Sequence, residues 1–295
     1  MSQLTDHHIL MAIKDLSLAA RRTIDGFMAG INKSKVKGPG LEFSQYRSYQ
    51  PGDDLRWLDW KRYARSDRYY IRESEIETSI SIRFLLDASH SMAHRDGNFT
   101  KMDYAKYLAA SLGWLAHSQG DSFGLYVFRG GDIFSLPSRK DPQHLARFFY
   151  QLENIQPGGR MDHPTQYRHL FTGDQKRELL VFITDMYEQD GEISRLLDVL
   201  ASLRHEIIVF QLMGRNELER DFSGYHQVED LETGEKIPVG SAQSQKDYQE
   251  KLQRWLAAVR LQLLDKQIAY RLISLDQPLD QALRDFLKQR QQTSG

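Results

Sequence analysis

The sequence predicts a doubly wound α/β fold with a mostly parallel sheet, preceded by an N-terminal module of helix and extended chain. Apolar runs typical of buried strands alternate with segments of helical period along most of the chain, which is the pattern of a parallel sheet flanked by helices. Two of the strand runs, residues 80–86 and 179–183, each lead into an acid, Asp87 and Asp185. Parallel α/β sheets place their ligands at such strand ends, so the same observation predicts where a site lies.

The N-terminal module begins with an amphipathic segment. Residues 4–31 carry apolar side chains near helical period and are expected to form a helix. The Gly-Pro-Gly sequence at residues 38–40 is then expected to interrupt regular secondary structure. Asp53 is positioned to cap a short helix in which Trp57 and Trp60 lie on one face, because residues three apart are neighbours on a helix surface.

The second domain is expected to span residues 73–295, after an N-terminal module of residues 1–72. Its strand and helix patterns follow one another as in a wound sheet. The expected elements are a strand pattern from 69 to 86, a helix at 100–119, paired strands at 121–128 and 133–136, a helix at 142–152, a strand at 179–183, a helix at 193–203, a strand at 207–212, a helix at 244–266, a strand at 270–273 and a helix at 279–289. An alternating segment at residues 225–239 predicts a hairpin insertion.

The composition is that of an ordinary globular protein. The 295 residues include 40% hydrophobic and 27% charged side chains, and the formal net charge of −1 predicts no global attraction to nucleic acid or anionic membranes. The absence of cysteine excludes disulfides, thiolate metal sites and cysteine nucleophiles. Because no apolar run approaches the ~20 residues that span a bilayer, and the N-terminus lacks the apolar core of a signal peptide, we expect a cytoplasmic protein.

Asp87, Ser89 and Ser91 form an Asp-x-Ser-x-Ser motif at the end of the first strand run. In a chain that leaves the strand still extended, residues two apart point the same way, so the three side chains can converge. One carboxylate and two hydroxyls are hard oxygen ligands that suit Mg²⁺, Mn²⁺ or Ca²⁺. The alternative is a strand-to-helix turn in which these side chains only cap the next helix. Asp185 favours the metal site, because it is expected at the same edge of the sheet.

The two strand-end acids resemble those of a von Willebrand factor A domain. In that family an Asp-x-Ser-x-Ser loop, a Thr from a middle loop and a later Asp form the metal-ion-dependent adhesion site. A longer motif is more specific: residues 38–60 read Gly-Pro-Gly-Leu-Glu-Phe-Ser-Gln-Tyr-Arg-Ser-Tyr-Gln-Pro-Gly-Asp-Asp-Leu-Arg-Trp-Leu-Asp-Trp, and Ala64-Arg65 follows. This motif resembles the signature of the DUF58 family, bacterial proteins whose C-terminal part is A-domain-like. The resemblance implies a von Willebrand factor A-like, Rossmann-type fold and an adapter that works with a MoxR-type AAA+ ATPase in a chaperone-like complex.

The sequence departs from the A-domain pattern at the third ligand. A Thr is expected just after the glycine pair Gly158-Gly159, but Arg160 stands there, and the nearest hydroxyl is that of Thr165. Either Thr165 reaches the ion by a different loop path, or this ligand is missing. Arg160 is also able to replace the cation with its own guanidinium, paired with one of the two strand-end acids.

Two function classes follow for this site. We expect a non-enzymatic adapter or scaffold in which Asp87, Ser89, Ser91 and Asp185 hold Mg²⁺, or Mn²⁺ or Ca²⁺, and an Asp or Glu of a protein partner completes the coordination. The competing hypothesis is a metal-assisted hydrolase that uses the same ion, with His90 or His94 as the nearby candidates for a general base. Because no Gly-x-Ser-x-Gly elbow surrounds either serine, histidines without a catalytic role are favoured.

The DUF58-like motif itself has two interpretations. Its Trp, Tyr and Arg side chains are of the kinds that anchor protein interfaces, which favours a docking face. The same side chains also suit a structural strap of buried tryptophans and ion pairs that fastens the N-terminal module to the second domain. We favour the strap, and the interleaved acids argue against nucleic-acid binding.

Overall fold

The chain divides into two compact units. One unit is Phe27–Thr78, and the other combines Met1–Gly26 with Ser79–Gly295. The expected helix around Trp57 and Trp60 lies outside the described residues. The computed structural model describes residues 15–34, 46–48, 63, 68–72, 79–161, 177–203, 205–219, 227–229, 236–238 and 242–294.

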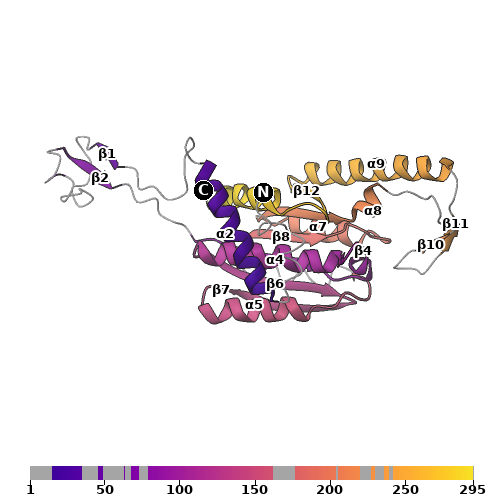
Figure 1. Cartoon of the computed structure of the whole chain (residues 1–295), viewed down its shortest axis with the longest axis horizontal. Coiled ribbons are helices and arrows are strands. Elements are labelled where there is room, and N and C mark those ends of the chain that lie inside the picture. The colour runs from indigo at the N-terminus through magenta and orange to yellow at the C-terminus, as the bar shows by residue number, and fades with distance from the viewer. Residues whose placement is uncertain are drawn as a thin grey trace. The chain divides into compact units, whose positions relative to one another are not determined.

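A six-stranded sheet forms the centre of the larger unit, with strand order β12-β9-β8-β3-β6-β7 (Figure 1). The strands are β3 (Ser81–Asp87), β6 (Ser122–Arg129), β7 (Asp132–Arg139), β8 (Leu179–Thr184), β9 (Glu206–Met213) and β12 (Ala269–Ser274). Neighbouring strands are parallel except for the β6–β7 hairpin, which is antiparallel. From β3 the chain builds outward through β6 and β7 and then crosses to β8 on the other side. The doubly wound, mostly parallel sheet is therefore confirmed, with its switch point between β3 and β8.

Helices cover both faces of this sheet. The described α-helices are α2 (Leu16–Ser34), α4 (Lys101–Ser118), α5 (Pro142–Asn154), α7 (Glu192–Ala201), α8 (Arg215–Leu218), α9 (Ala242–Asp265) and α10 (Asp280–Ser294). Phe84 of β3 contacts Phe148 of α5 and Phe286 of α10, with ring centroids 5.5 and 6.4 Å apart. A Cβ on Gly113 of α4 would lie 2.5 Å from the Phe148 ring, so this glycine permits the close packing of α4 on α5. These contacts place α4, α5 and α10 on one face.

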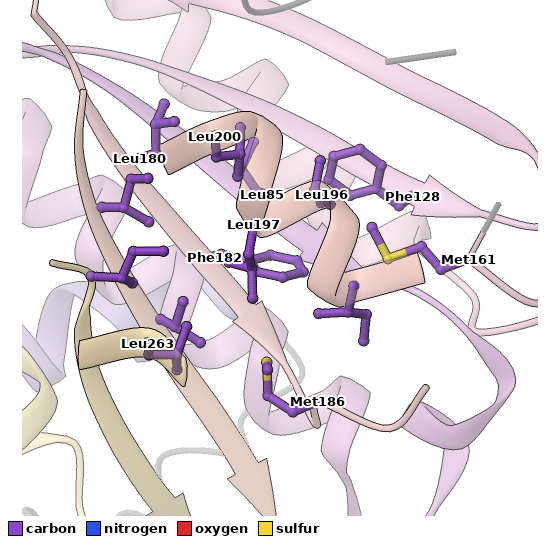
Figure 2. Packing of buried hydrophobic residues seen from close by; sticks show 14 of the residues in the cluster. Leu85, Phe128, Met161, Leu180, Phe182, Met186, Leu196, Leu197, Leu200 and Leu263 are labelled. Carbon is purple, nitrogen blue, oxygen red and sulfur yellow. The ribbon is translucent and has the colours of Figure 1, made fainter. Parts of the chain in front are cut away.

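The opposite face of the sheet packs against α7 and α9. Leu85, one residue beyond Phe84, points to this second face, as the two-residue period of a strand requires. It belongs to a buried cluster with strand residues such as Phe182, α7 residues such as Leu196 and α9 residues such as Leu263 (Figure 2). Because β3 is buried on both faces, Phe84, Leu85 and Leu86 follow one another without alternation, and the buried Arg83 within the strand pairs with Glu178.

The expected elements from residue 100 onward are confirmed, with ends shifted by a few residues. The hairpin expected within residues 225–239 is present as the antiparallel pair of β10 (Gln227–Glu229) and β11 (Lys236–Pro238). In the smaller unit, β1 (Tyr46–Ser48) pairs with β2 (Tyr70–Arg72). Among the described helices, none combines the length and apolar character that crossing a membrane requires.

Candidate functional site

The candidate site lies where the sheet order reverses. Asp87 is the last residue of β3, and Asp185 directly follows β8, its parallel neighbour. Because parallel strands end at the same edge, the two acids expected from the sequence are brought to one place. Both are buried, with Asp87 fully shielded from solvent and Asp185 2% exposed.

The Asp87 carboxylate organises the loop that follows it. Its Oδ1 accepts a hydrogen bond from the Ser89 backbone N–H at 2.9 Å, and its Oδ2 accepts one from the Thr184 hydroxyl at 2.7 Å. The Ser89 and Ser91 hydroxyl oxygens lie 3.1 Å apart. The structure therefore gathers the side chains of the Asp-x-Ser-x-Ser motif, although not by an extended chain: Ser91 lies in a short 3₁₀ helix, η4 (His90–Ala93), that begins directly after Ser89.

A glycine pair supports this loop from the side. The Gly158 N–H donates to the Ala88 carbonyl, and the His90 N–H donates to the Gly159 carbonyl, both at 2.9 Å. Gly159 has φ +69°, and a Cβ there would lie only 2.7 Å from the Cα of Gly130. A side chain at this position would therefore strain the backbone and collide with the β6–β7 turn, so glycine is required here.

Asp185 is paired with a buried lysine. Its Oδ1 accepts the Tyr187 N–H at 3.0 Å, and its Oδ2 accepts Lys101 Nζ at 2.9 Å. The same Nζ donates to Glu217 Oε1, also at 2.9 Å. Lys101 is the first residue of α4, and its side chain is 5% exposed. The structure thus shows one strand-end acid, Asp185, in contact with a cation, the Lys101 ammonium.

The electrostatics of this cluster are unbalanced. Burial, together with the nearby charge of Asp185, raises the pKa of Asp87 to about 6, although hydrogen bonds from Thr184 and Ser89 act in the opposite direction. Burial acts to lower the pKa of Lys101, but the carboxylates of Asp185 and Glu217 outweigh it and raise that pKa. When these groups are ionised, the Lys101 ammonium is shared between Asp185 and Glu217, and Asp87 adds a further negative charge beside Asp185.

The donor set can be compared with what a hard divalent cation needs. Within the described part of the chain, no three His, Cys, Asp or Glu side chains gather into a metal-binding group. The oxygens beside Asp87 are instead the hydroxyls of Ser89 and Ser91, which also suit Mg²⁺, and the two carboxylate oxygens of Asp87 together offer about four lone-pair positions. The uncompensated charge and the oxygen donors fit a cation of Mg²⁺ type with few charged ligands.

The structure shows no contact with the Asp87 carboxylate, within its described part, for the side chains of Arg160, His90 and His94. Thr165 is outside the described residues, so its role as third ligand stays a prediction, and Arg160 is exposed. His90 is also exposed, and the His94 ring contacts α8, with Nε2 2.8 Å from Asn216 Oδ1 and 3.7 Å from Glu217 Oε2. An open groove beside the loop is lined in part by Arg129, Asp132, Phe134, Gly158 and Gly159, and neither histidine belongs to its lining.

Sequence reasoning missed three residues of the cluster: Thr184, Lys101 and Glu217. Thr184 comes next to Asp87 because the β3–β8 register pairs Leu86 with Ile183, and sequence does not give register. For Lys101 a signal existed: a cation in the first turn of a helix faces the positive end of the helix dipole, so another group must hold it there. Glu217 lies on a four-residue helix that the sequence analysis did not expect.

The wound sheet, its hairpin edge and the acids at its switch point define the class: the larger unit is a von Willebrand factor A-like domain. The chain belongs to the DUF58 family, since the model of that family, described as a protein of unknown function, matches residues 45–257. This confirms the resemblance stated from residues 38–60.

Several known proteins are similar to this chain. The uncharacterized protein Rv1480 of Mycobacterium tuberculosis is 26% identical over 233 residues, which cover 78% of this chain and 73% of that protein. Among solved structures, the conserved hypothetical protein BatB from Bacteroides thetaiotaomicron is 18% identical, with a TM-score of 0.49 over 73% of this chain and 99% of that one. The VWA domain of SpRpn10 is 12% identical, with a TM-score of 0.38 over 72% and 95% of the two chains.

Proposed function

We propose that this protein is a non-enzymatic adapter that binds a protein partner through a divalent cation held at the end of β3. Asp87, Ser89 and Ser91 supply ligands from the protein, and an Asp or Glu of the partner completes the coordination. The observation that carries the proposal is the meeting of the two serine hydroxyls, 3.1 Å apart, beside a buried carboxylate at the sheet's switch point.

The charge of the cluster supports this mechanism. The pKa of Asp87 is raised because the carboxyl is buried and because Asp185 lies close to it. A divalent cation bound at the Asp87 carboxylate would supply the missing positive charge. With one carboxylate and neutral hydroxyls as its protein ligands, Mg²⁺ or Mn²⁺ would stay electron-poor and attract a further carboxylate from outside.

The partner class comes from the family rather than from the site. The DUF58 signature supports a MoxR-type AAA+ ATPase as the partner, with this chain as the adapter of a chaperone-like complex. The contact surface would be the exposed rim around η4, where His90 is exposed. The cytoplasmic location stays a prediction from the sequence.

A metal-assisted hydrolase is the competing proposal for the same ion. It needs a general base within hydrogen-bond reach of a metal-bound water, and a closed pocket that excludes bulk solvent. The His94 ring is engaged by Asn216 at 2.8 Å, and the groove beside the loop is open. Both observations favour the adapter.

Thermal melting with and without Mg²⁺ or Mn²⁺, in EDTA-treated buffer of constant ionic strength, tests the metal site. A cation that binds the native state raises the melting temperature, because binding to the folded form shifts the unfolding equilibrium. Asp87→Asn should abolish this rise, whereas Asp265→Asn, a change at an exposed position near the end of α9, should keep it. An unchanged response in Asp87→Asn would place the ion elsewhere, and turnover of a phosphate ester that is lost in Asp87→Asn would favour the hydrolase.

A further inference from the structure

Lys101 is a buried cation in an unfavourable position. It occupies the first turn of α4, where the helix dipole repels positive charge, and only 5% of its side chain is exposed. A buried ammonium is costly unless carboxylates compensate it, and Asp185 and Glu217 do so at 2.9 Å each. The α4 N-terminus itself is already satisfied by a capping box between Thr100 and Asp103, so helix capping does not explain the lysine.

Glu217 is held in place independently of Lys101. Its Oε2 accepts the Gly214 N–H at 2.7 Å at the start of α8. The Asn216 side chain next to it donates to the Arg95 carbonyl at 2.9 Å and contacts the His94 ring. The lysine is therefore shared between two fixed carboxylates, one at the candidate cation site and one on α8.

We propose that Lys101 is a positioning residue that sets how strongly the site binds its cation, by neutralising Asp185 and withholding it from the ion. This inference rests on the proposed cation site at Asp87. With Asp185 paired to Lys101, Asp87 is the carboxylate left to bind the cation. Weak ligation by the protein is what leaves a divalent ion dependent on a carboxylate from the partner.

Because Lys101 is shared between Asp185 and Glu217, substitutions at Lys101 and at Glu217 are expected to change the cation affinity in opposite directions. Lys101→Met removes the ammonium but keeps an unbranched side chain, so Asp185 becomes available to the ion and cation binding becomes tighter. Glu217→Gln removes one of the two carboxylates that contact Lys101 and leaves Asp185 as the other. The ammonium then neutralises Asp185 more completely, and cation binding becomes weaker. A purely structural lysine would not produce this pair of effects, because loss of packing does not tighten ion binding.

The experiment is a titration with Mn²⁺, in which free Mn²⁺ is counted by its electron paramagnetic resonance signal. We expect Lys101→Met to lower the Kd by about tenfold or more, because Asp185 loses its ammonium partner and becomes available to the ion. Glu217→Gln should raise the Kd. Lys101→Arg, which keeps the positive charge that Lys101→Met removes, should have a Kd close to the wild-type value. Lys106→Met is the matched control on the same helix: Lys106 Nζ contacts the Glu153 carbonyl at 3.1 Å, so its removal should leave the Kd unchanged.

The outcomes separate this inference from the cation site itself. If the wild type binds Mn²⁺ through Asp87 and Lys101→Met binds it equally or less well, the role of Lys101 is wrong while the site stands. If Lys101→Met binds Mn²⁺ and the wild type does not, the lysine replaces the ion in the natural protein, and the cation mechanism of the adapter fails. If neither protein binds Mn²⁺, both are overturned. Should Lys101→Met fail to fold in a melting scan, a Kd unchanged or lowered in Glu217→Gln overturns the inference by itself.

Discussion

Replacing Asp87 by asparagine tests the electrostatics of the site in the absence of any ion. Asparagine keeps the shape and the acceptor for the Ser89 N–H but removes the titratable charge. The pKa of Asp87 is raised from 3.8 to about 6 in the folded protein. A shift of about two pKa units corresponds to roughly 3 kcal/mol, which is the cost of ionising this buried carboxyl in the native state.

The sign of the pH dependence follows from linkage. Between pH ~4 and ~6 the folded protein holds a proton on Asp87 that the unfolded chain has released, so this group makes stability fall as pH rises, by about 1.4 kcal/mol per pH unit. Above the folded-state pKa the full cost is present. Asp87→Asn should therefore be more stable than the wild type by up to about 3 kcal/mol at pH 8 in EDTA, and by close to nothing near pH 4.

Urea denaturation at a series of pH values, with the far-ultraviolet circular dichroism as signal, measures this difference. Asp265→Asn, at an exposed position, is the control and should follow the wild type throughout. Saturating Mg²⁺ should reverse the order at pH 8, because the ion stabilises the wild type only. A variant that is less stable than the wild type by the same amount at every pH would refute the reasoning, since it would show that the Asp87 charge is already compensated in the native protein.

Three further predictions concern the support of the site and the N-terminal motif. Thr184→Val removes the hydroxyl that donates to Asp87 and accepts from the Met186 N–H, so it should cost about 1–3 kcal/mol in urea melts and weaken the Mg²⁺ response. Gly159→Ala should lower the melting temperature and the Mg²⁺ response together, because φ +69° and the 2.7 Å approach to Gly130 forbid a Cβ, whereas Gly97→Ala, at φ +59° with open space around it, should leave the Mg²⁺ response intact. Trp57→Ala should cost about 3–5 kcal/mol if the DUF58 motif is a structural strap, as core truncations do; unchanged stability with reduced partner binding would identify a docking face.

The sheet and the position of the site at its strand ends could be predicted from the sequence because both depend on local patterns. A strand buried on both faces leaves a mostly apolar run, as in residues 179–183 and 84–86, and the acid that follows each run is visible without any structure. The helix from Lys101 was equally accessible, because Thr100 and Asp103 form a capping box that marks its start.

The contacts within the site were beyond sequence reasoning because they join distant segments. Lys101, Asp185 and Glu217 come from α4, from the end of β8 and from α8, and only the folded sheet brings them together. The expectation of an extended chain through Ser91 was wrong, because the Ser89–Ser91 segment turns into η4. A 3₁₀ turn of this length leaves no periodic signal in a sequence.

The central claim is that a cation at Asp87 recruits a partner's carboxylate. Affinity purification from a cell extract tests it most directly, with wild-type protein and with Asp87→Asn as bait, each in Mg²⁺ and in EDTA at equal ionic strength, followed by identification of the retained proteins. The account predicts that an AAA+ ATPase is retained by the wild type in Mg²⁺ and lost in the other three samples, with Asp265→Asn behaving as the wild type. Equal retention of the ATPase in all samples would contradict the account and would direct attention to the Trp- and Arg-rich motif of residues 38–65 as the docking face.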